Sequence, residues 1–256
     1  MTSPTSVPQQ PIAAEWLELP EQNGQPPLRC WWARPVAAPP RGAVLLLPEV
    51  FGVNGWVRSV AERLAEAGYG TLALPIFART APGLELAYDE ASLLQGREHR
   101  DAVTTTAVLA DARRAIDWLQ QQPGLQRRPV GCVGFCFGGH LALIVATLPQ
   151  VAVTLAFYGA RVSSFRPGGG PPTLELVPEI GGDLICLVGD QDALMPAAEV
   201  ASIATALQSM PKGPRRELLV LKGAGHGFMC EQRPDFDAAA SKRGWATLNE
   251  ALAAAL

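Results

Sequence analysis

The hexapeptide Gly134-Phe135-Cys136-Phe137-Gly138-Gly139 decides the fold of this 256-residue chain. An apolar run typical of a strand, 128–133, precedes it, and a run typical of a buried helix, 140–146, follows it. Strand, sharp turn and helix form the context of a nucleophile elbow, in which a strained turn lifts the central side chain clear of a sheet. Glycines flank such a turn because the two backbones pass too close together for a Cβ atom. Cys136 is therefore a candidate nucleophile, since a thiolate with a lowered pKa is strongly nucleophilic.

A purely structural interpretation of this stretch stays open. Gly-rich turns between a strand and a helix are common in α/β proteins, and a buried cysteine often serves only as a small apolar residue. The remaining parts of the chain favour the catalytic interpretation.

Patterns typical of strands and of helices alternate along the chain. Short apolar runs predict strands at 16–19, 28–34, 42–48, 70–75, 128–133, 151–159, 184–189 and 217–221. Helical spacing predicts helices at 56–67, 98–121, 140–146, 196–207 and 236–256, and loops are expected at 77–96 and 160–182. In the longest helix we expect the charged Asp111 to lie mostly off the apolar stripe.

This alternation predicts an α/β fold. We expect a doubly wound, mostly parallel sheet inside a three-layer αβα sandwich, with an antiparallel hairpin at its N-terminal edge. One domain is expected over residues 13–256, after a disordered lead-in at 1–12 that is polar and carries prolines.

Composition argues against several functional classes. The formal net charge is −3 and no Lys/Arg cluster stands out, so neither nucleic acid nor a membrane is an expected partner. The five cysteines are odd in number and form no C-x-x-C pair, which favours a reducing, cytoplasmic location. The three histidines lack metal-ligand spacing, and we expect neither a metal nor another cofactor. The oligomeric state stays open, and a monomer is compatible with the sequence.

Three predicted strands end in groups that together make a catalytic triad. Cys136 follows one strand, Asp192 follows the next-to-last and His226 follows the last. The carboxyl ends of parallel strands meet at one edge of a sheet, and the order nucleophile, acid, base is that of α/β-hydrolases. In such a triad His226 takes the proton of Cys136, and Asp192 orients the imidazole and stabilises its charged form.

Other polar residues compete for these roles. Asp190 is an alternative acid, but Asp192 lies deeper in the loop and is favoured, whereas Asp190 suits a turn. His140 directly follows the elbow, and we expect it to pack inside the helix and not to act as the base. The two oxyanion-hole donors are expected to be the backbone N–H of Phe137 and an N–H near Val50. The dipole of the elbow helix also favours a thiolate at Cys136.

Several motifs in this order resemble the dienelactone hydrolase (carboxymethylenebutenolidase) family of the α/β-hydrolase superfamily. The resemblance extends from about residue 15 to the C-terminus, and it rests on the elbow together with Leu47–Asn54, Phe77–Arg79, Phe157–Gly159, Gln191-Asp192 with Pro196, and Gly225–Phe228.

The resemblance implies a single-domain hydrolase with a Cys-His-Asp triad. Its substrate would be the small lactone ring of a dienelactone, opened to maleylacetate through an acyl-enzyme intermediate. It also implies that Glu49 holds the resting thiol and that Arg79 helps to bind the substrate carboxylate. Tyr158 would lie close to the site as a second substrate-binding residue.

The chain departs from the family pattern after the histidine. An arginine that grips the substrate carboxylate is expected where Cys230 stands, and Arg233 lies three residues further on. A general carboxylesterase or thioesterase on the same scaffold is therefore an alternative. A non-catalytic binding or scaffold protein is a further one, and nothing in the sequence indicates the extended cleft of a cysteine peptidase.

Overall fold

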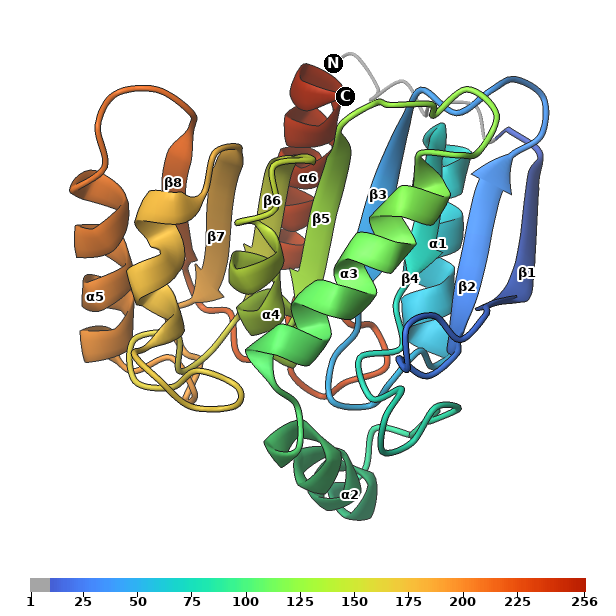
Figure 1. Cartoon of the computed structure of the whole chain (residues 1–256). Helices are drawn as coiled ribbons and strands as arrows, with labels where there is room; N and C mark the ends of the chain where they lie inside the picture. Colours follow the sequence, from blue (N-terminus) through green and yellow to red (C-terminus); the bar gives the residue numbers. More distant parts are fainter. Residues whose placement is uncertain (1–9) are drawn as a thin grey trace.

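A twisted sheet of eight strands forms the centre of the computed structural model, which describes residues 10–256 (Figure 1). The strand order is β1-β2-β4-β3-β5-β6-β7-β8. β1 pairs antiparallel with β2 and β2 antiparallel with β4, while all other neighbours are parallel. The predicted doubly wound sheet with an antiparallel N-terminal edge is confirmed. The strands are β1 (Ile12–Leu19), β2 (Leu28–Pro35), β3 (Gly42–Leu47), β4 (Tyr69–Ala73), β5 (Val130–Phe135), β6 (Val151–Phe157), β7 (Asp183–Gly189) and β8 (Arg216–Leu221).

Helices cover both faces of the sheet, as the apolar runs of its central strands require. In β3 the side chains of Leu45 and Leu47 join one buried cluster, and Val44 and Leu46 join the other. A strand buried on both faces must be apolar throughout. The first face carries α3 (Thr105–Leu119), α4 (Phe137–Val145) and α5 (Ala197–Gln208), and the second carries α1 (Gly55–Glu66) and α6 (Ala238–Ala255).

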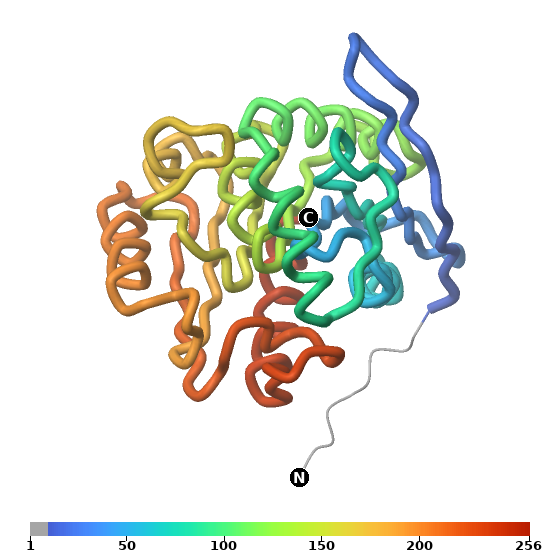
Figure 2. The backbone as a smooth tube through the Cα atoms, turned by 90° about the horizontal axis from the view of Figure 1, so that it is seen from below, coloured from blue at the N-terminus to red at the C-terminus, as the bar shows by residue number. Residues whose placement is uncertain are grey.

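One helix, α2 (Glu90–Asp101), belongs to neither layer. It lies below the sheet in Figure 1, beyond the carboxyl ends of the parallel strands. Figure 2, which looks at the molecule from below, shows α2 in front of the central strands. This is the edge at which α/β enzymes bind their ligands.

The predicted boundaries were wrong in three places. The expected helix 98–121 is two helices, because α2 ends before Ala102 and the side chain of Thr104 caps the start of α3. The expected loop 77–96 ends at Asp89, whose side chain caps the first turn of α2. The expected loop 160–182 contains a 3-10 helix, Thr173–Glu179.

The N-terminal boundary is close to the expected one. The first strand begins at Ile12, within the predicted lead-in. Residues 1–9 of that lead-in lie outside the described residues. Within residues 10–256, no helix combines the length and the apolar composition needed to cross a membrane.

Candidate active site

Cys136 occupies the sharp turn between β5 and α4. Its backbone has φ 53° and ψ −118°, in a region that costs a non-glycine residue energy. The turn is held by a hydrogen bond from the Cys136 N–H to the carbonyl of Phe157, at 3.0 Å. A Cβ atom on Gly134 would lie 2.5 Å from the carbonyl carbon of Gly138, so glycine is required where strand and helix cross.

The structure brings Cys136, His226 and Asp192 into contact. His226 Nε2 lies 3.1 Å from the sulfur of Cys136, and His226 Nδ1 lies 2.7 Å from Asp192 Oδ2. The other oxygen of Asp192 accepts from the N–H of Leu194 at 2.8 Å, which fixes the carboxylate. Asp190 instead accepts from the N–H of Gly223 at 2.7 Å and so joins the loop after β7 to the loop after β8. Asp192, and not Asp190, is therefore the acid that faces the imidazole.

The electrostatics of His226 favour its charged form. Burial alone would lower its pKa, but the negative charges of Cys136 and Asp192 and their hydrogen bonds outweigh burial and raise the pKa to about 10. The imidazole is thus expected to hold a proton at neutral pH. The N-terminus of α4 adds a favourable dipole at Cys136.

Glu49 does not hold the thiol, in contrast to the expectation from the resemblance. It is fully buried at the end of β3, and its Oε1 accepts from Arg233 Nη1 at 2.8 Å. Its other oxygen has no hydrogen-bond partner among the described residues. The physical reason is charge pairing: a buried carboxylate needs a cation, and Arg233, 14% exposed, supplies it.

Arg233, three residues beyond Cys230, supplies a positive charge close to the nucleophile. Burial lowers the pKa of Arg233, but the neighbouring Glu49 and Cys136 raise it above its ordinary value, so the guanidinium stays charged. Cys230 is fully buried, and burial first and Glu49 second raise its pKa to about 12. Cys230 is therefore an uncharged thiol, and Arg233 is the cation next to the nucleophile.

Tyr158 lies beside the site, next to the ring of His226. It is fully buried, and its ring meets the His226 ring edge-on with centroids 5.1 Å apart. Its hydroxyl has no partner among the described residues. Tyr158 therefore packs against the imidazole and does not line the cavity at Cys136, so its expected contact with substrate stays a prediction.

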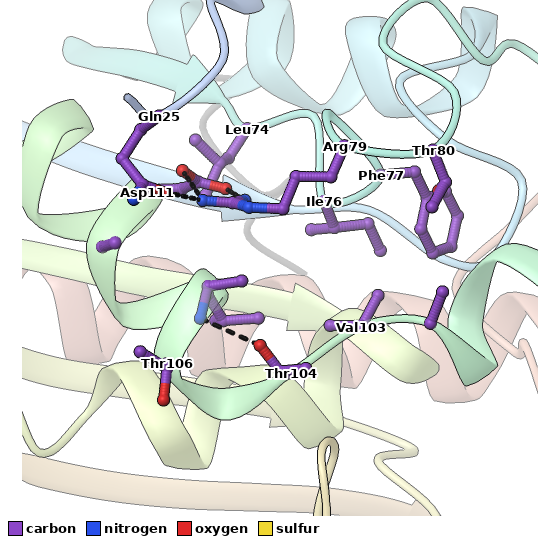
Figure 3. A pocket seen from close by; sticks show the side chains of 14 residues that line it. Gln25, Leu74, Ile76, Phe77, Arg79, Thr80, Val103, Thr104, Thr106 and Asp111 are labelled. Atoms are coloured by element: carbon purple, nitrogen blue, oxygen red, sulfur yellow. Dashed lines mark hydrogen bonds and ion pairs between the residues drawn. The ribbon is translucent and has the colours of Figure 1, made fainter. Parts of the chain in front are cut away.

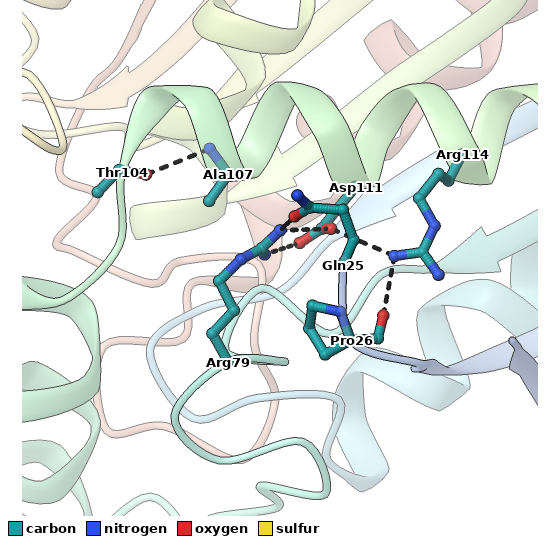
Figure 4. A network of polar contacts seen from close by, with 7 residues as sticks. All are labelled: Gln25, Pro26, Arg79, Thr104, Ala107, Asp111 and Arg114. Carbon is teal, nitrogen blue, oxygen red and sulfur yellow. Dashed lines mark hydrogen bonds and ion pairs between the residues drawn. The ribbon is translucent and has the colours of Figure 1, made fainter. Parts of the chain in front are cut away.

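Arg79 points away from the nucleophile. It forms an ion pair with both oxygens of Asp111 on α3, with Nη2–Oδ1 at 3.1 Å, and it also contacts Gln25 (Figures 3 and 4). Asp111 is only 4% exposed, contrary to the expectation that it lies off the apolar stripe, and Arg114 lies 3.7 Å from it. A buried carboxylate needs a positive partner, which Arg79 supplies. Arg79 and Asp111 border a cavity of about 290 Å³, which shares no lining residue with a second cavity at Cys136.

A cavity of about 150 Å³ opens above Cys136 and His226. Val50 and Phe137, the expected sources of the oxyanion-hole N–H groups, both border it. Phe137 is the first residue of α4, and the first N–H groups of a helix lack intrahelical acceptors. The position of Phe137 thus suits it to donate to an oxyanion.

His140 supports one wall of this cavity. Its Nδ1 contacts the carbonyl of Ala160 at 2.8 Å, where only a donor is compatible, and its Nε2 contacts the Thr173 hydroxyl at 2.7 Å. Burial dominates its environment and lowers its pKa to about 4. His140 is thus a neutral residue that ties α4 to the loop after β6, in line with the expected packing role.

Three further lining residues, Arg97, Arg100 and Arg161, were not identified from the sequence. Arg97 and Arg100 were hidden because their segment lacks a strong apolar stripe and its start was interpreted as a loop. Arg161 stands just past the carboxyl end of β6, and that position was the available signal. Among residues 10–256, no group of three His, Cys, Asp or Glu side chains is placed to hold a metal ion.

Comparisons with known proteins identify the family and the fold of the chain. The family model described as "Dienelactone hydrolase family" matches residues 28–256. A protein of Synechocystis sp. named "Putative carboxymethylenebutenolidase" is 34% identical over 234 residues, covering 91% of this chain and 94% of the relative. "Carboxymethylenebutenolidase" of Pseudomonas putida is 29% identical over 193 residues, covering 75% of this chain and 77% of the relative. The crystal structure of a "Putative Dienelactone Hydrolase" from Klebsiella pneumoniae superposes with a TM-score of 0.83 at 25% identity, covering 95% of this chain and 99% of that one.

Proposed function

Because this chain belongs to the dienelactone hydrolase family, we propose that it cleaves the ester bond of a small lactone or ester with Cys136 as its nucleophile. The observation that carries the proposal is the contact series of Cys136, His226 and Asp192, with distances of 3.1 and 2.7 Å, of which Cys136 and His226 line one cavity. Nucleophile, base and orienting acid within hydrogen-bond reach are what acyl transfer needs.

In the first half of the reaction the thiolate of Cys136 attacks the carbonyl carbon. The carbonyl electrons move onto oxygen, and the N–H groups of Phe137 and Val50 stabilise that oxyanion. When the intermediate collapses, the carbon–oxygen ester bond breaks and His226 Nε2 gives its proton to the departing alkoxide. A thioester on Cys136 remains, and for a lactone the alcohol stays tethered to it.

In the second half, His226 takes a proton from water. The resulting hydroxide adds to the thioester carbonyl, and the carbon–sulfur bond then breaks to release the carboxylic acid and the thiolate. The released thiolate and the protonated imidazole of His226 restore the starting state of the site. Asp192 holds the imidazole in the tautomer with Nδ1–H throughout, so that Nε2 faces the reacting atoms.

A simple carboxylic ester or thioester is the second candidate substrate. The resemblance led us to expect arginines that bind the substrate carboxylate at positions 79 and 230. Arg79 is instead paired with Asp111 at another cavity and Cys230 is uncharged, which favours a substrate without that carboxylate. The cation that remains close to the nucleophile, Arg233, is already paired with Glu49.

Hydrolysis of a dienelactone and of 4-nitrophenyl acetate by the purified protein tests the proposal. Cys136→Ala should lower kcat by at least about 10³-fold on every substrate that the protein turns over, as expected for loss of a nucleophile. Cys186→Ala, which removes a buried cysteine of β7 outside the cavity, is the matched control. Turnover of the simple ester alone selects the second candidate, and turnover that survives in Cys136→Ala, or no turnover of either substrate, contradicts the proposal.

A further inference from the structure

We infer that the mouth of the cavity above Cys136 holds an anion subsite, formed by Arg97 of α2 and Arg161 of the loop after β6. This subsite would select esters whose apolar acyl chain ends in a carboxylate. The inference rests on the proposed hydrolase function and adds the class of substrate.

The lining of the cavity is strongly one-sided in charge. Four of its described lining residues are arginines and none is acidic, although the chain as a whole carries a formal net charge of −3. A cleft lined by one sign of charge focuses its field and raises the local concentration of oppositely charged substrate. The four are Arg97, Arg100, Arg161 and Arg233.

Two of these cations have no carboxylate partner. Arg233 is paired with Glu49 at 2.8 Å, and Arg100 with Asp101 at 2.7 Å. Among residues 10–256, no carboxylate oxygen lies within 4 Å of Arg97 or Arg161. The uncompensated positive charge of the cavity therefore lies at these two residues.

Both arginines border the cavity, one from α2 and one from the loop after β6. Leu93, Arg97 and Arg100 are spaced by four and three residues, which places them on one face of α2, and all three line the cavity. Arg161 adopts the left-handed φ of 63°, which is uncommon for a non-glycine residue, and its guanidinium lies 4.8 Å from the Phe165 ring centroid.

The rest of the lining fits the apolar part of such a substrate. Between the nucleophile and the arginines the cavity is bordered by aliphatic and aromatic side chains, namely Val50, Phe51, Leu93, Phe137, Phe165 and Leu194. An ester with an apolar chain and a terminal carboxylate would place its reacting carbonyl at Cys136 and its charge at Arg97 and Arg161. Arginine suits this role because its planar guanidinium binds a carboxylate through two hydrogen bonds.

A pair of chromogenic esters tests the inference. 4-Nitrophenyl hemiadipate carries a terminal carboxylate, and 4-nitrophenyl hexanoate has an acyl chain of the same length without one. Partly exposed ion pairs contribute modestly each, so two of them predict a kcat/KM ratio of about fivefold or more in favour of the hemiadipate. High salt should reduce the ratio, since the Debye length falls from about 10 Å at 0.1 M to about 3 Å at 1 M.

Variants assign the preference to the two arginines. R97Q/R161Q should bring the ratio close to that of the wild type at high salt, whereas R97K/R161K should keep most of it because the charges remain. Arg243→Gln, which removes an exposed arginine from α6 and so from outside the cavity, is the control that keeps the ratio. A wild-type ratio near one, or a ratio that R97Q/R161Q leaves unchanged, overturns the inference.

Alkylation of Cys136 provides a readout that needs no turnover. The other four cysteines are buried, so Cys136 is the accessible thiol for iodoacetate, which is anionic, and iodoacetamide, which is neutral. Relative to a small free thiol, the wild type should favour iodoacetate, and R97Q/R161Q should lose that bias. If neither ester is hydrolysed but the bias is present and lost in the variant, the proposed function fails while the anion subsite stands. If the bias is absent, the subsite fails whatever the protein hydrolyses.

Discussion

Replacing Gly96 of α2 by alanine should damage catalysis although Gly96 touches no reacting atom. Gly96 is the one buried residue of α2, and it packs directly on the backbone of Val50. A Cβ atom at Gly96 would lie 3.0 Å from the carbonyl carbon of Val50 and closer still to its oxygen. Ordinary carbon–carbon contacts lie at about 3.5–4.0 Å, so the helix and the Val50 loop must separate by roughly 0.5–1 Å.

That displacement should lower the catalytic rate strongly and the free energy of unfolding only slightly. A misplacement of about 1 Å in a site costs up to about 10²-fold in rate, so kcat should fall about 10- to 100-fold. Overpacking costs about 1–3 kcal/mol of unfolding free energy, while alanine gains up to about 1 kcal/mol over glycine inside a helix. The free energy of unfolding should therefore fall by only about 0–2 kcal/mol.

Steady-state hydrolysis of 4-nitrophenyl hexanoate and urea unfolding measure the two effects. Gly55→Ala is the matched control, because Gly55 is also helical and a Cβ atom there would meet only the side chain of Arg58, at 3.9 Å. A drop in kcat on the neutral ester reports movement of the Val50 loop, whereas a loss of preference for the hemiadipate alone reports movement of α2. A Gly96→Ala protein with wild-type kcat and wild-type preference would refute the reasoning, since the contact would then position neither.

Three other predictions concern polar groups that the structure pairs or buries. Asp192→Asn should lower kcat about 10⁴-fold in ester hydrolysis through the wrong imidazole tautomer, whereas Asp190→Asn should affect unfolding more than kcat; equal kcat losses would contradict the assignment of the acid. The pKa of His140 is lowered to about 4, so the unfolded chain binds its proton first as pH falls, and the stability it provides above about pH 6.5 is lost towards pH 4. Urea unfolding at pH 7 and pH 4.5 should show a loss of up to roughly 3 kcal/mol that is smaller in His140→Asn, and an identical loss in the variant would refute this origin. Arg233→Met should cost about 3–5 kcal/mol of unfolding free energy by stranding the buried Glu49 charge, and adding Glu49→Gln should restore much of it; a double variant as unstable as Arg233→Met would argue against the pairing.

The fold and the meeting of Cys136, His226 and Asp192 were predictable from patterns within single segments. Close backbone contacts require the glycines around Cys136, as Gly134 shows against Gly138 four residues on, and uninterrupted apolar runs indicate strands buried on both faces. Loops after parallel strands converge at one edge, so Cys136, Asp192 and His226 meet without knowledge of any side-chain conformation.

The pairing of charges was not predictable, because it depends on which distant groups folding brings together. Arg79 pairs with the buried carboxylate of Asp111, 32 residues away, and Arg233 pairs with Glu49, 184 residues away. Neither partner is visible in local spacing. Both pairings follow from burial, because an unpaired carboxylate inside the protein costs several kcal/mol and pairing with a guanidinium offsets that cost.

The same distinction separates the chemistry of this site from its selectivity. Triad and oxyanion groups lie on turns fixed by the sheet, where a small error would abolish the reaction. The unpaired cations lie instead on α2 and on the loop after β6, outside both helical layers, and α2 buries only Gly96 of its own residues. Segments with so few buried contacts accept substitution at little cost in stability, so the charge of the mouth can change without disturbing Cys136. The Gly96 contact with Val50 is a close constraint on α2, and it couples the placement of Arg97 to the loop that carries Val50.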